Sequence, residues 1–562
     1  MSYATLGGHE GVVKLLLERG DVNPNSSDSC GLTPLSYATV FEDKGVVRLL
    51  LEHGSVNLDS LDSGGQTSPS FTDISGAEGA VLLPKRGNDN LWGDGGRRLL
   101  LFAAWVGDKD LVGLLLERGD ANPNFPDGNF RTPLSLAASG GHESVVELLL
   151  ERDEVNHYSQ DYNGQTPLSH AASRGYDGIV KLLLEHHKTN PNLPDRSGRT
   201  PLSFGALGGH EGVVKLLLDC REVNSNLRDH SGQTPLSLAA EGGHEGVVKL
   251  FLEDDKVNPD VRDYGGQTPL SLAAEIGHEG VVKLILERDD VNPNLGDDSG
   301  QTPLSSAAGA GHKGVVKLLL ERHNVNPDSR DASGRTPLSF AAEEGHEDVV
   351  RLLLERDEVN PDLQDSSGAT PLLFSAIGGR EGVVKLLLEC GEVNPDSPDT
   401  NGRTPLSFAA EGEHEGVMRL LLERDEVNPD SQDHNRQTSL LFAASRGHEG
   451  VVKLLLGRDE VNSDSQDHGG RTPLSFAAEG GHGGVMKLLL QRLEVYAYVD
   501  YEPDYNGRTP LSFAAEGGHE DEVELLLRHG ANADKPDNNG RTPLSFAVQK
   551  GYEGVVRLFL QN

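Results

Sequence analysis

Histidine is the residue type whose placement most readily suggests chemistry in this chain, because eleven of its 21 copies recur at one repeated position. Neutral imidazole is a common zinc ligand, so a row of histidines invites a metal hypothesis. A zinc helix of the His-Glu-x-x-His type needs its second histidine four residues after the first, but the residue four places after His244 is Val248. Histidines on neighbouring packed helices would stand about 8–10 Å apart, several times a metal–ligand distance. We therefore expect these side chains to serve a turn and the chain to bind no metal. The eleven are His9, His142, His210, His244, His278, His312, His346, His414, His448, His482 and His519.

Other arrangements that carry chemistry are missing from the sequence. The Asp-rich segments contain calcium-ligand residue types, but none has the Asp-x-Asp/Asn-x-Asp/Asn-Gly order with a Glu at the twelfth place. There is no Gly-Lys-Ser/Thr after a glycine-rich loop and no Gly-x-Ser-x-Gly nucleophile turn. The cysteines, Cys30, Cys220 and Cys390, have no histidine partner at a suitable spacing. We therefore expect no catalytic residue, no cofactor and no enzymatic activity.

These residues are placed by an internal repeat that extends along almost the whole chain. The tetrad Thr-Pro-Leu-Ser, or a variant of it, returns every 34 residues from Thr132 to Thr472. Further copies begin at Thr33, Thr509 and Thr542. Self-similarity at such a period is typical of units that must stack on one another to bury an apolar face. The 562 residues therefore predict one array and not the several separate domains that their number alone would suggest.

Within one unit the residues after the threonine predict two short helices joined by a glycine turn. Thr472 is a good N-cap, and Pro473 suits the first helical position because its missing N–H costs nothing there. Gly480 and Gly481 end this helix, and His482 begins the turn to a second helix of the Val-Val-Lys-Leu-Leu-Leu type. Each helix has about ten residues, fewer than the roughly 12–15 that an isolated helix needs in water. A polar loop follows, and a glycine two places before the next threonine predicts a tight hairpin.

This pattern resembles the ankyrin repeat, whose signature joins a β-turn, Thr-Pro-Leu-His-x-Ala, a Gly-His turn and a Val-Val-x-Leu-Leu-Leu helix. The resemblance implies an all-α repeat solenoid of stacked helix-turn-helix ankyrin units with projecting β-hairpin loops. Serine replaces the histidine of the family's tetrad, which removes the side chain expected to hydrogen-bond to a neighbouring repeat. The resemblance further implies that the hairpin tips and the end of the first helix line a concave face that binds a partner.

Two positions of the repeat are candidates for contact with that partner. The end of the first helix carries Glu in six repeats and Arg in two, and the residue before the threonine is Arg or Gln in most. A stripe of carboxylates would favour a basic contact surface on the partner, whereas the arginines could also pair with the carboxylates locally. The candidate partner-binding residues are Arg131, Arg174, Glu241, Glu275, Arg335, Glu343, Arg403, Glu411, Arg446, Arg471, Glu479, Arg508 and Glu516.

One segment breaks the pattern and divides the predicted array. Thr-Ser-Pro-Ser replaces the tetrad at Thr67, and Pro84 falls inside the expected second helix, where proline costs about 3 kcal/mol. Residues 88–96 are glycine-rich, which is typical of a linker. We therefore predict N-terminal repeats over 1–60, the first of them truncated, a degenerate repeat and linker over 61–97, and a continuous array over 98–562.

Composition limits the kind of partner. The chain has 50 Lys and Arg against 88 Asp and Glu, a formal net charge of −38. Such a field repels nucleic acid and anionic lipid, so we expect a protein or peptide partner with a basic contact surface, no nucleic acid and no membrane insertion. Three scattered cysteines and no secretory leader favour an intracellular protein, in the cytoplasm or the nucleus.

The sequence thus predicts a non-enzymatic scaffold that binds a protein or peptide on the concave face formed by hairpins and inner helices. The alternative is the recognition or regulatory ankyrin tail of a larger signalling protein whose effector domain is missing from this chain. The sequence begins inside a repeat, which motivates that alternative. An enzyme with an unrecognised site is disfavoured because every candidate residue recurs at a stacking position.

We predict that limited proteolysis cuts the chain first between Thr67 and Gly96. The degenerate unit weakens two neighbouring interfaces at once, and solenoid stability is nearly a sum of unit and interface terms. Mass spectrometry of the first fragments checks this expectation. A first cut inside the regular stretch from Thr132 to Thr472 would contradict it.

Overall fold

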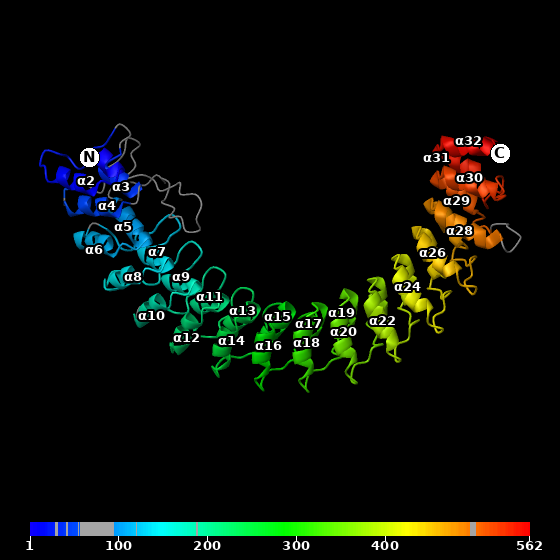
Figure 1. The fold of residues 1–562 in the computed structure, drawn as a ribbon, viewed down its shortest axis with the longest axis horizontal. Helices are drawn as coiled ribbons and strands as arrows, with labels where there is room; N and C mark the ends of the chain where they lie inside the picture. The colour runs from blue at the N-terminus through cyan, green and yellow to red at the C-terminus, as the bar shows by residue number, and fades with distance from the viewer. Residues whose placement is uncertain are drawn as a thin grey trace. The chain divides into compact units, whose positions relative to one another are not determined.

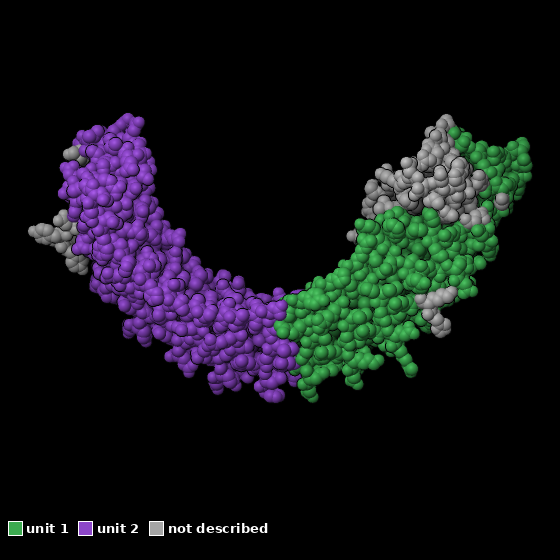
Figure 2. Space-filling model, turned by 180° about the vertical axis from the view of Figure 1, so that it is seen from behind, with its two compact units in different colours: residues 1–273, 283–291 green, residues 274–282, 292–562 purple. Residues whose placement is uncertain are grey.

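The structure is a computed structural model, and the part of the chain that it describes is built from α-helices and loops, with no β-strand among the described residues. The described residues are 1–28, 32–40, 43–53, 55–56, 95–119, 121–186, 189–494 and 502–561. They belong to two compact units, which Figure 2 colours separately: unit 1 comprises 1–273 and 283–291, and unit 2 comprises 274–282 and 292–562.

Unit 1 is a stack of helix pairs (Figure 1). Its first helices are α1 (Ser2–Leu6), α3 (Pro34–Val40), α5 (Gly95–Val106), α7 (Pro133–Gly140), α9 (Pro167–Arg174), α11 (Pro201–Leu207) and α13 (Pro235–Glu241). Its second helices are α2 (Glu10–Leu17), α4 (Lys44–Glu52), α6 (Lys109–Arg118), α8 (Glu143–Leu150), α10 (Asp177–Glu185), α12 (Glu211–Asp219) and α14 (Glu245–Leu252). From α5 to α13 each first helix packs on the next first helix, and the second helices do the same from α2 to α14. Residues of α15 (Pro269–Ile276) and α16 (Glu279–Leu286) are divided between the two units.

Unit 2 repeats this arrangement (Figure 1). Its first helices are α17 (Pro303–Gly309), α19 (Pro337–Glu344), α21 (Pro371–Ile377), α23 (Pro405–Glu411), α25 (Ser439–Arg446), α27 (Pro473–Gly480), α29 (Pro510–Gly517) and α31 (Pro543–Lys550). Its second helices are α18 (Lys313–Leu320), α20 (Glu347–Leu354), α22 (Glu381–Glu389), α24 (Glu415–Leu422), α26 (Glu449–Leu456), α28 (Gly483–Glu494), α30 (Glu520–Arg528) and α32 (Glu553–Gln561). From α17 to α31 each first helix packs on the next first helix, and from α18 to α32 each second helix packs on the next second helix. Neighbouring pairs therefore cover one another.

The start of each first helix explains why the tetrad recurs. The Oγ1 atom of Thr472 accepts a hydrogen bond from the N–H of Ser475 at 3.3 Å, and Pro473 occupies the first turn. Leu474 is buried in the core, and Ser475 is fully buried with its hydroxyl 3.2 Å from that of Thr472. The serine that stands in place of the family's histidine therefore bonds within its own helix start.

The side-chain hydrogen bond between repeats comes from the histidine of the glycine turn. His414 is the N-cap residue of α24, and its Nε2 lies 3.0 Å from the carbonyl oxygen of Ile377 in the preceding repeat. A carbonyl only accepts, so Nε2 must carry the proton and donate it. Arg380 replaces histidine in one repeat and donates its Nε to the carbonyl oxygen of Glu343 at 3.0 Å. The histidines that make this carbonyl joint include His142, His210, His244, His312, His346, His414, His448, His482 and His519.

A glycine at the end of the preceding first helix makes room for the ring in most of these joints. Gly379 has a φ of 66°, and a Cβ atom built on it would lie 2.5 Å from Nδ1 of His414. Glycine is therefore favoured twice at this position, by the left-handed backbone and by the neighbouring imidazole, although Glu413 takes the same position with a φ of 62° and His448 still makes its joint. The glycine of one repeat therefore lies against the histidine of the next. The histidine joins two repeats in addition to the turn role that the sequence predicts for it.

The second helices are joined by a contact between glutamate and glycine. Glu381 begins α22, and a Cβ atom built on Gly416 of the next repeat would stand 1.8 Å from its Oε1. The carboxylate therefore lies against the first turn of α24, where unpaired N–H groups and the helix dipole favour negative charge. This glutamate thus stands at the start of its own helix and also contacts the start of the next second helix in the stack.

The projecting loops end in a tight turn. The N–H of Gly164 donates to the carbonyl oxygen of Asp161 at 2.9 Å, and the N–H of Asp161 donates to that of Gln165 at 2.9 Å. Oδ1 of Asp161 accepts the N–H groups of Asn163 and Gln165, both at 2.8 Å. These bonds close the predicted hairpin although the described residues on either side of it form no strand.

The predicted break in the array lies almost wholly outside the described residues. Residues 57–94, which include Thr67 and Pro84, are not among them, so the boundaries at 61 and 97 stay predictions. One detail differs: α5 begins at Gly95, inside the segment 88–96 that was expected to be a linker. Buried Leu99 and Leu100 anchor this helix to the core, which lets it extend backwards by one turn.

We predict that Gly379→Ala destabilises its joint by about 1–3 kcal/mol, because alanine is disfavoured at positive φ by about 1–2 kcal/mol and the displaced His414 loses a hydrogen bond worth about 1 kcal/mol. Hydrogen exchange of α22 and α24 should become faster than in the unmodified chain. Gly391→Ala is the control, since a Cβ built there meets nothing within 4 Å. Equal exchange in the two variants would contradict the preference for glycine at position 379.

Candidate interaction face

The structure places the predicted contact residues at two levels of each repeat. Arg403 lies at the base of the hairpin, directly before the N-cap residue Thr404, and Glu411 is the last residue of α23. In unit 2 the two levels are joined by ion pairs across eight residues. The pairs are Arg335–Glu343 at 3.2 Å, Arg403–Glu411 at 2.5 Å, Arg471–Glu479 at 2.9 Å, and Arg508–Glu516. These four carboxylates are therefore partly neutralised, as the alternative of local pairing predicts.

Each of these arginines also lies over an aromatic ring of the first helix. The guanidinium carbon of Arg403 is 3.7 Å from the ring centroid of Phe408 and 4.3 Å from that of Phe442 in the next repeat. Such stacking is attractive because the ring face is electronegative, by about 0.5–1 kcal/mol at exposed sites. The same contact is made by Arg335 over Phe340 at 4.1 Å, Arg471 over Phe476 at 3.9 Å and Arg508 over Phe513 at 4.0 Å.

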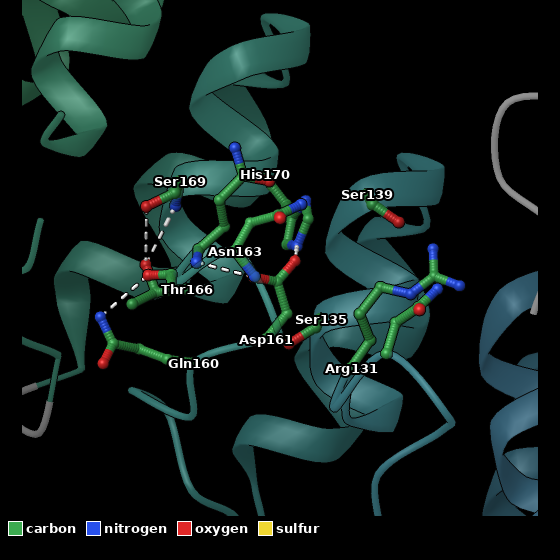
Figure 3. A network of polar contacts seen from close by, with 12 residues as sticks. Arg131, Ser135, Ser139, Gln160, Asp161, Asn163, Thr166, Ser169 and His170 are labelled. Atoms are coloured by element: carbon green, nitrogen blue, oxygen red, sulfur yellow. Dashed lines mark hydrogen bonds and ion pairs between the residues drawn. The ribbon is translucent and has the colours of Figure 1, made fainter. Parts of the chain in front are cut away.

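The hairpin-base arginine has a third partner, the aspartate of the turn. Arg131 lies 2.8 Å from the buried carboxylate of Asp127. Where Gln165 takes the place of arginine, His170 approaches Asp161 at 3.1 Å, and Figure 3 shows its ring turned toward that carboxylate. Burial raises the pKa of Asp161, but the hydrogen bonds from His170 and the backbone outweigh it and hold this pKa below its ordinary value. The buried aspartate thus has a side-chain donor in the repeats of Arg131 and Gln165 alike.

Glu411 links two repeats. Its Oε2 accepts from Arg403 of its own repeat, and its Oε1 accepts from Arg446 of the next repeat at 2.8 Å. Partial burial raises the pKa of Glu411, but the two guanidinium groups outweigh burial and hold this pKa below its usual range. Arg446 and Glu411, both predicted as partner contacts, are therefore also contacts within the stack.

The other candidates differ in their surroundings. In the repeat of Glu241 the hairpin base carries Gln233, whose Nε2 donates to Oε2 of Glu241 at 2.8 Å. Gln233 carries no charge, in contrast to the arginines at this position in unit 2. The repeat of Glu275 likewise has glutamine, Gln267, at the hairpin base. Arg174 is exposed at the end of α9.

Aromatic side chains at the hairpin tips were not among the predicted contacts. Tyr162, Tyr264 and Tyr505 are 58%, 68% and 60% exposed, and each directly follows a turn aspartate. Arg196, at the same position of the repeat after Tyr162, lies 4.6 Å from the centroid of that ring. The sequence holds the signal for this set, because the residue after the invariant turn aspartate changes from repeat to repeat.

The residues weighed for metal or catalytic chemistry remain apart in the described ranges. No three His, Cys, Asp or Glu side chains in that part of the chain lie close enough to hold a metal ion. The recurring histidines instead donate to backbone carbonyls, as set out above. Cys220 and Cys390 are free thiols. A separate search of the described helices finds none that is long and apolar enough to span a bilayer.

Comparison with known families agrees with the repeat architecture. The model of the family described as ankyrin repeats (3 copies) matches residues 1–68, 99–195, 155–229, 202–295, 270–365, 357–433, 425–502 and 493–562. A search of curated proteins gives no match.

We predict a coupling free energy of about 1 kcal/mol between Arg403 and Glu411 in a double-mutant cycle, at the upper end of about 0.2–1 kcal/mol for exposed pairs, because stacking holds the guanidinium in place. The lowered pKa of Glu411 means that this stabilisation is present at neutral pH and is lost as pH falls through the folded-state pKa. Unfolding of the single and double alanine variants at several pH values measures both.

The control pair is Arg419 and Glu415, whose side chains are 60% and 43% exposed. It should couple by no more than about 0.5 kcal/mol, as i,i+4 pairs on helix surfaces do. Equal coupling in the two pairs would remove the special role given to Arg403.

Proposed function

Because the chain belongs to the ankyrin-repeat family, whose members generally serve protein–protein interaction, we propose that it is a non-enzymatic scaffold that binds a protein or peptide. The partner binds on the face made by the hairpin tips and the ends of the first helices. The protein works inside the cell, in the cytoplasm or the nucleus, where the free thiols Cys220 and Cys390 stay reduced.

The observation that carries this proposal is a rigid backbone that presents variable side chains. Successive hairpin tips are hydrogen-bonded to one another: the N–H of Arg196 donates to Asn163 O at 2.9 Å, and that of His230 donates to Ser197 O at 2.8 Å. In unit 2 the N–H of Ala332 donates to Ser299 O at 2.8 Å in the same way. A preorganised row of tips loses little conformational entropy on binding, which favours recognition over chemistry.

We propose a basic contact surface on the partner, and the net charge of −38 supports it. The ion pairs of Glu343, Glu411, Glu479 and Glu516 reduce the contribution of these carboxylates. Glu241 and Glu275 lie in repeats that carry the uncharged residue glutamine at the hairpin base, and we propose that they contribute to attraction at the face. The aromatic hairpin tips supply apolar contact area beside these charges.

We predict that a Glu241→Gln/Glu275→Gln variant captures the partner more slowly and with a flatter salt dependence than the unmodified chain, because screening acts only on the charge that remains. Photo-crosslinking from position 264 in cell extract, followed by mass spectrometry, identifies the partner. Association rates of the purified partner are then measured from about 0.1 M to 1 M salt.

Glu253→Gln/Asp289→Asn is the matched control, since it removes the same charge from exposed positions after second helices. It should leave association nearly unchanged. If both double variants behaved like the unmodified chain while crosslinking mapped the partner elsewhere, the proposed face would be wrong.

A further inference from the structure

The loops that follow the second helices are linked by one side chain per repeat. Nδ2 of Asn294 donates to the carbonyl oxygen of Asn324 at 2.6 Å, and its Oδ1 accepts the N–H of Asn326 at 2.8 Å. Both partners lie in the loop of the next repeat, 30 and 32 residues later. An amide suits this position because it has a donor for the carbonyl and an acceptor for the N–H. Asn124 and Asn192 of unit 1 form the same pair of bonds.

Several loops of unit 2, among them those of Asp328, Asp362, Asp396 and Asp430, carry aspartate in place of this asparagine. Oδ2 of Asp328 accepts the N–H of Asn360 at 2.9 Å, as the asparagine oxygen does at its own position. The other carboxyl oxygen, Oδ1, is buried and has no hydrogen-bond partner. By equivalence of the repeats it stands where the amide nitrogen of asparagine donates to a carbonyl. The same buried Oδ1 without a partner occurs in Asp328, Asp362, Asp396 and Asp430.

An ionised carboxylate does not suit this place, because two acceptors would face each other with no proton between them. A buried acceptor without a donor costs about 1–3 kcal/mol, and more when it is charged. A neutral carboxyl group has one O–H donor and one acceptor, and so reproduces the hydrogen-bonding pattern of the amide. The native loops therefore accommodate aspartate best in its protonated form.

We propose that Asp328, Asp362, Asp396 and Asp430 form proton-operated joints between the loops of unit 2. At each joint Oδ1 takes up a proton from solvent and donates it to the main-chain carbonyl oxygen of the next loop, and loss of that proton to solvent breaks the bond. The loops of this stretch tighten as pH falls and loosen as it rises. The equivalent asparagine joints of unit 1 have no such dependence.

The pKa of each of the four carboxyl groups is raised in spite of the charged and polar groups around it. Burial raises the pKa of each, and the N–H of the next loop lowers it by less. Arg330 lowers the pKa of Asp328, the Ser431 hydroxyl lowers that of Asp396, and Glu460 raises that of Asp430. The stabilisation that a raised pKa provides is fully present when the pH is below the ordinary aspartate pKa of about 3.9. It is lost as the pH rises through the pKa of the folded state.

The test replaces all four aspartates by asparagine in the full chain (D328N/D362N/D396N/D430N). Hydrogen exchange by mass spectrometry follows the loop amides of Asn360, Asn394, Asn428 and Asn462, corrected for the intrinsic effect of pH. At pH 7 we expect exchange about fivefold slower than in the unmodified chain, the factor for one restored hydrogen bond, and a higher melting temperature. At pH 4 the difference should disappear. Equal exchange in the two chains at pH 7 would overturn the proposal.

Two further variants separate the joints from net charge. D357N/E392Q/D425N/E426Q removes the same number of charges from exposed sites in three of these loops and should leave both pH profiles unchanged. If it matched the effect of the four asparagines, general charge repulsion would explain the data and the proposal would fall. N294D places an aspartate in an asparagine joint, and exchange of the Asn326 amide should then become faster at pH 7 than at pH 4. An unchanged amide in N294D would also overturn the proposal.

Discussion

The end of each first helix leaves backbone carbonyls without a partner, and the fold depends on the next repeat supplying a donor to one of them. The Nε2–H of His414 meets this need for Ile377. Gly379, which has a left-handed backbone and carries no Cβ, leaves room for the ring to reach the carbonyl. Since helices of seven or eight residues do not persist alone, this contact makes the stability of each unit a property of its neighbours. Arg380 shows that the requirement is for a donor of suitable reach and not for imidazole itself.

Residues at the hairpin base and at the ends of the first helices also make contacts within the stack. Arg403 contacts two phenylalanine rings and the carboxylate of Glu411, so much of the charge on this face serves the stack itself. Side chains at the hairpin tips, such as Tyr264, are widely exposed to solvent. Substitution at the tips should therefore have little effect on the fold, whereas substitution at the hairpin base also removes contacts within the stack.

Local features of the fold could be predicted from the sequence because they depend on residues close together in the chain. The N-cap at Thr472, the glycine stop at Gly481 and the apolar faces of both helices are of this kind. The partners of His414 and Glu381 could not be predicted, because they lie about one repeat away and spacing alone does not show which group faces which. The sequence shows which repeats carry arginine and glutamate at the candidate positions, but the pairing of these residues depends on side-chain directions that residue types leave open.

The carbonyl joint connects residues 37 apart wherever the period is 34, and one place shows what happens when the period changes. Between Thr472 and Thr509 the step is 37 residues, and His519 still bonds to the carbonyl oxygen of Glu479, now 40 residues away, at 2.9 Å. The joint therefore needs only the carbonyl at the end of one first helix and the donor side chain of the next repeat, and it tolerates a longer loop between them. Recombination between misaligned copies of the gene could delete or duplicate whole units and leave every remaining joint matched. The number of repeats is then free to differ between related genes, and the near identity of units within this chain is what such exchange would produce.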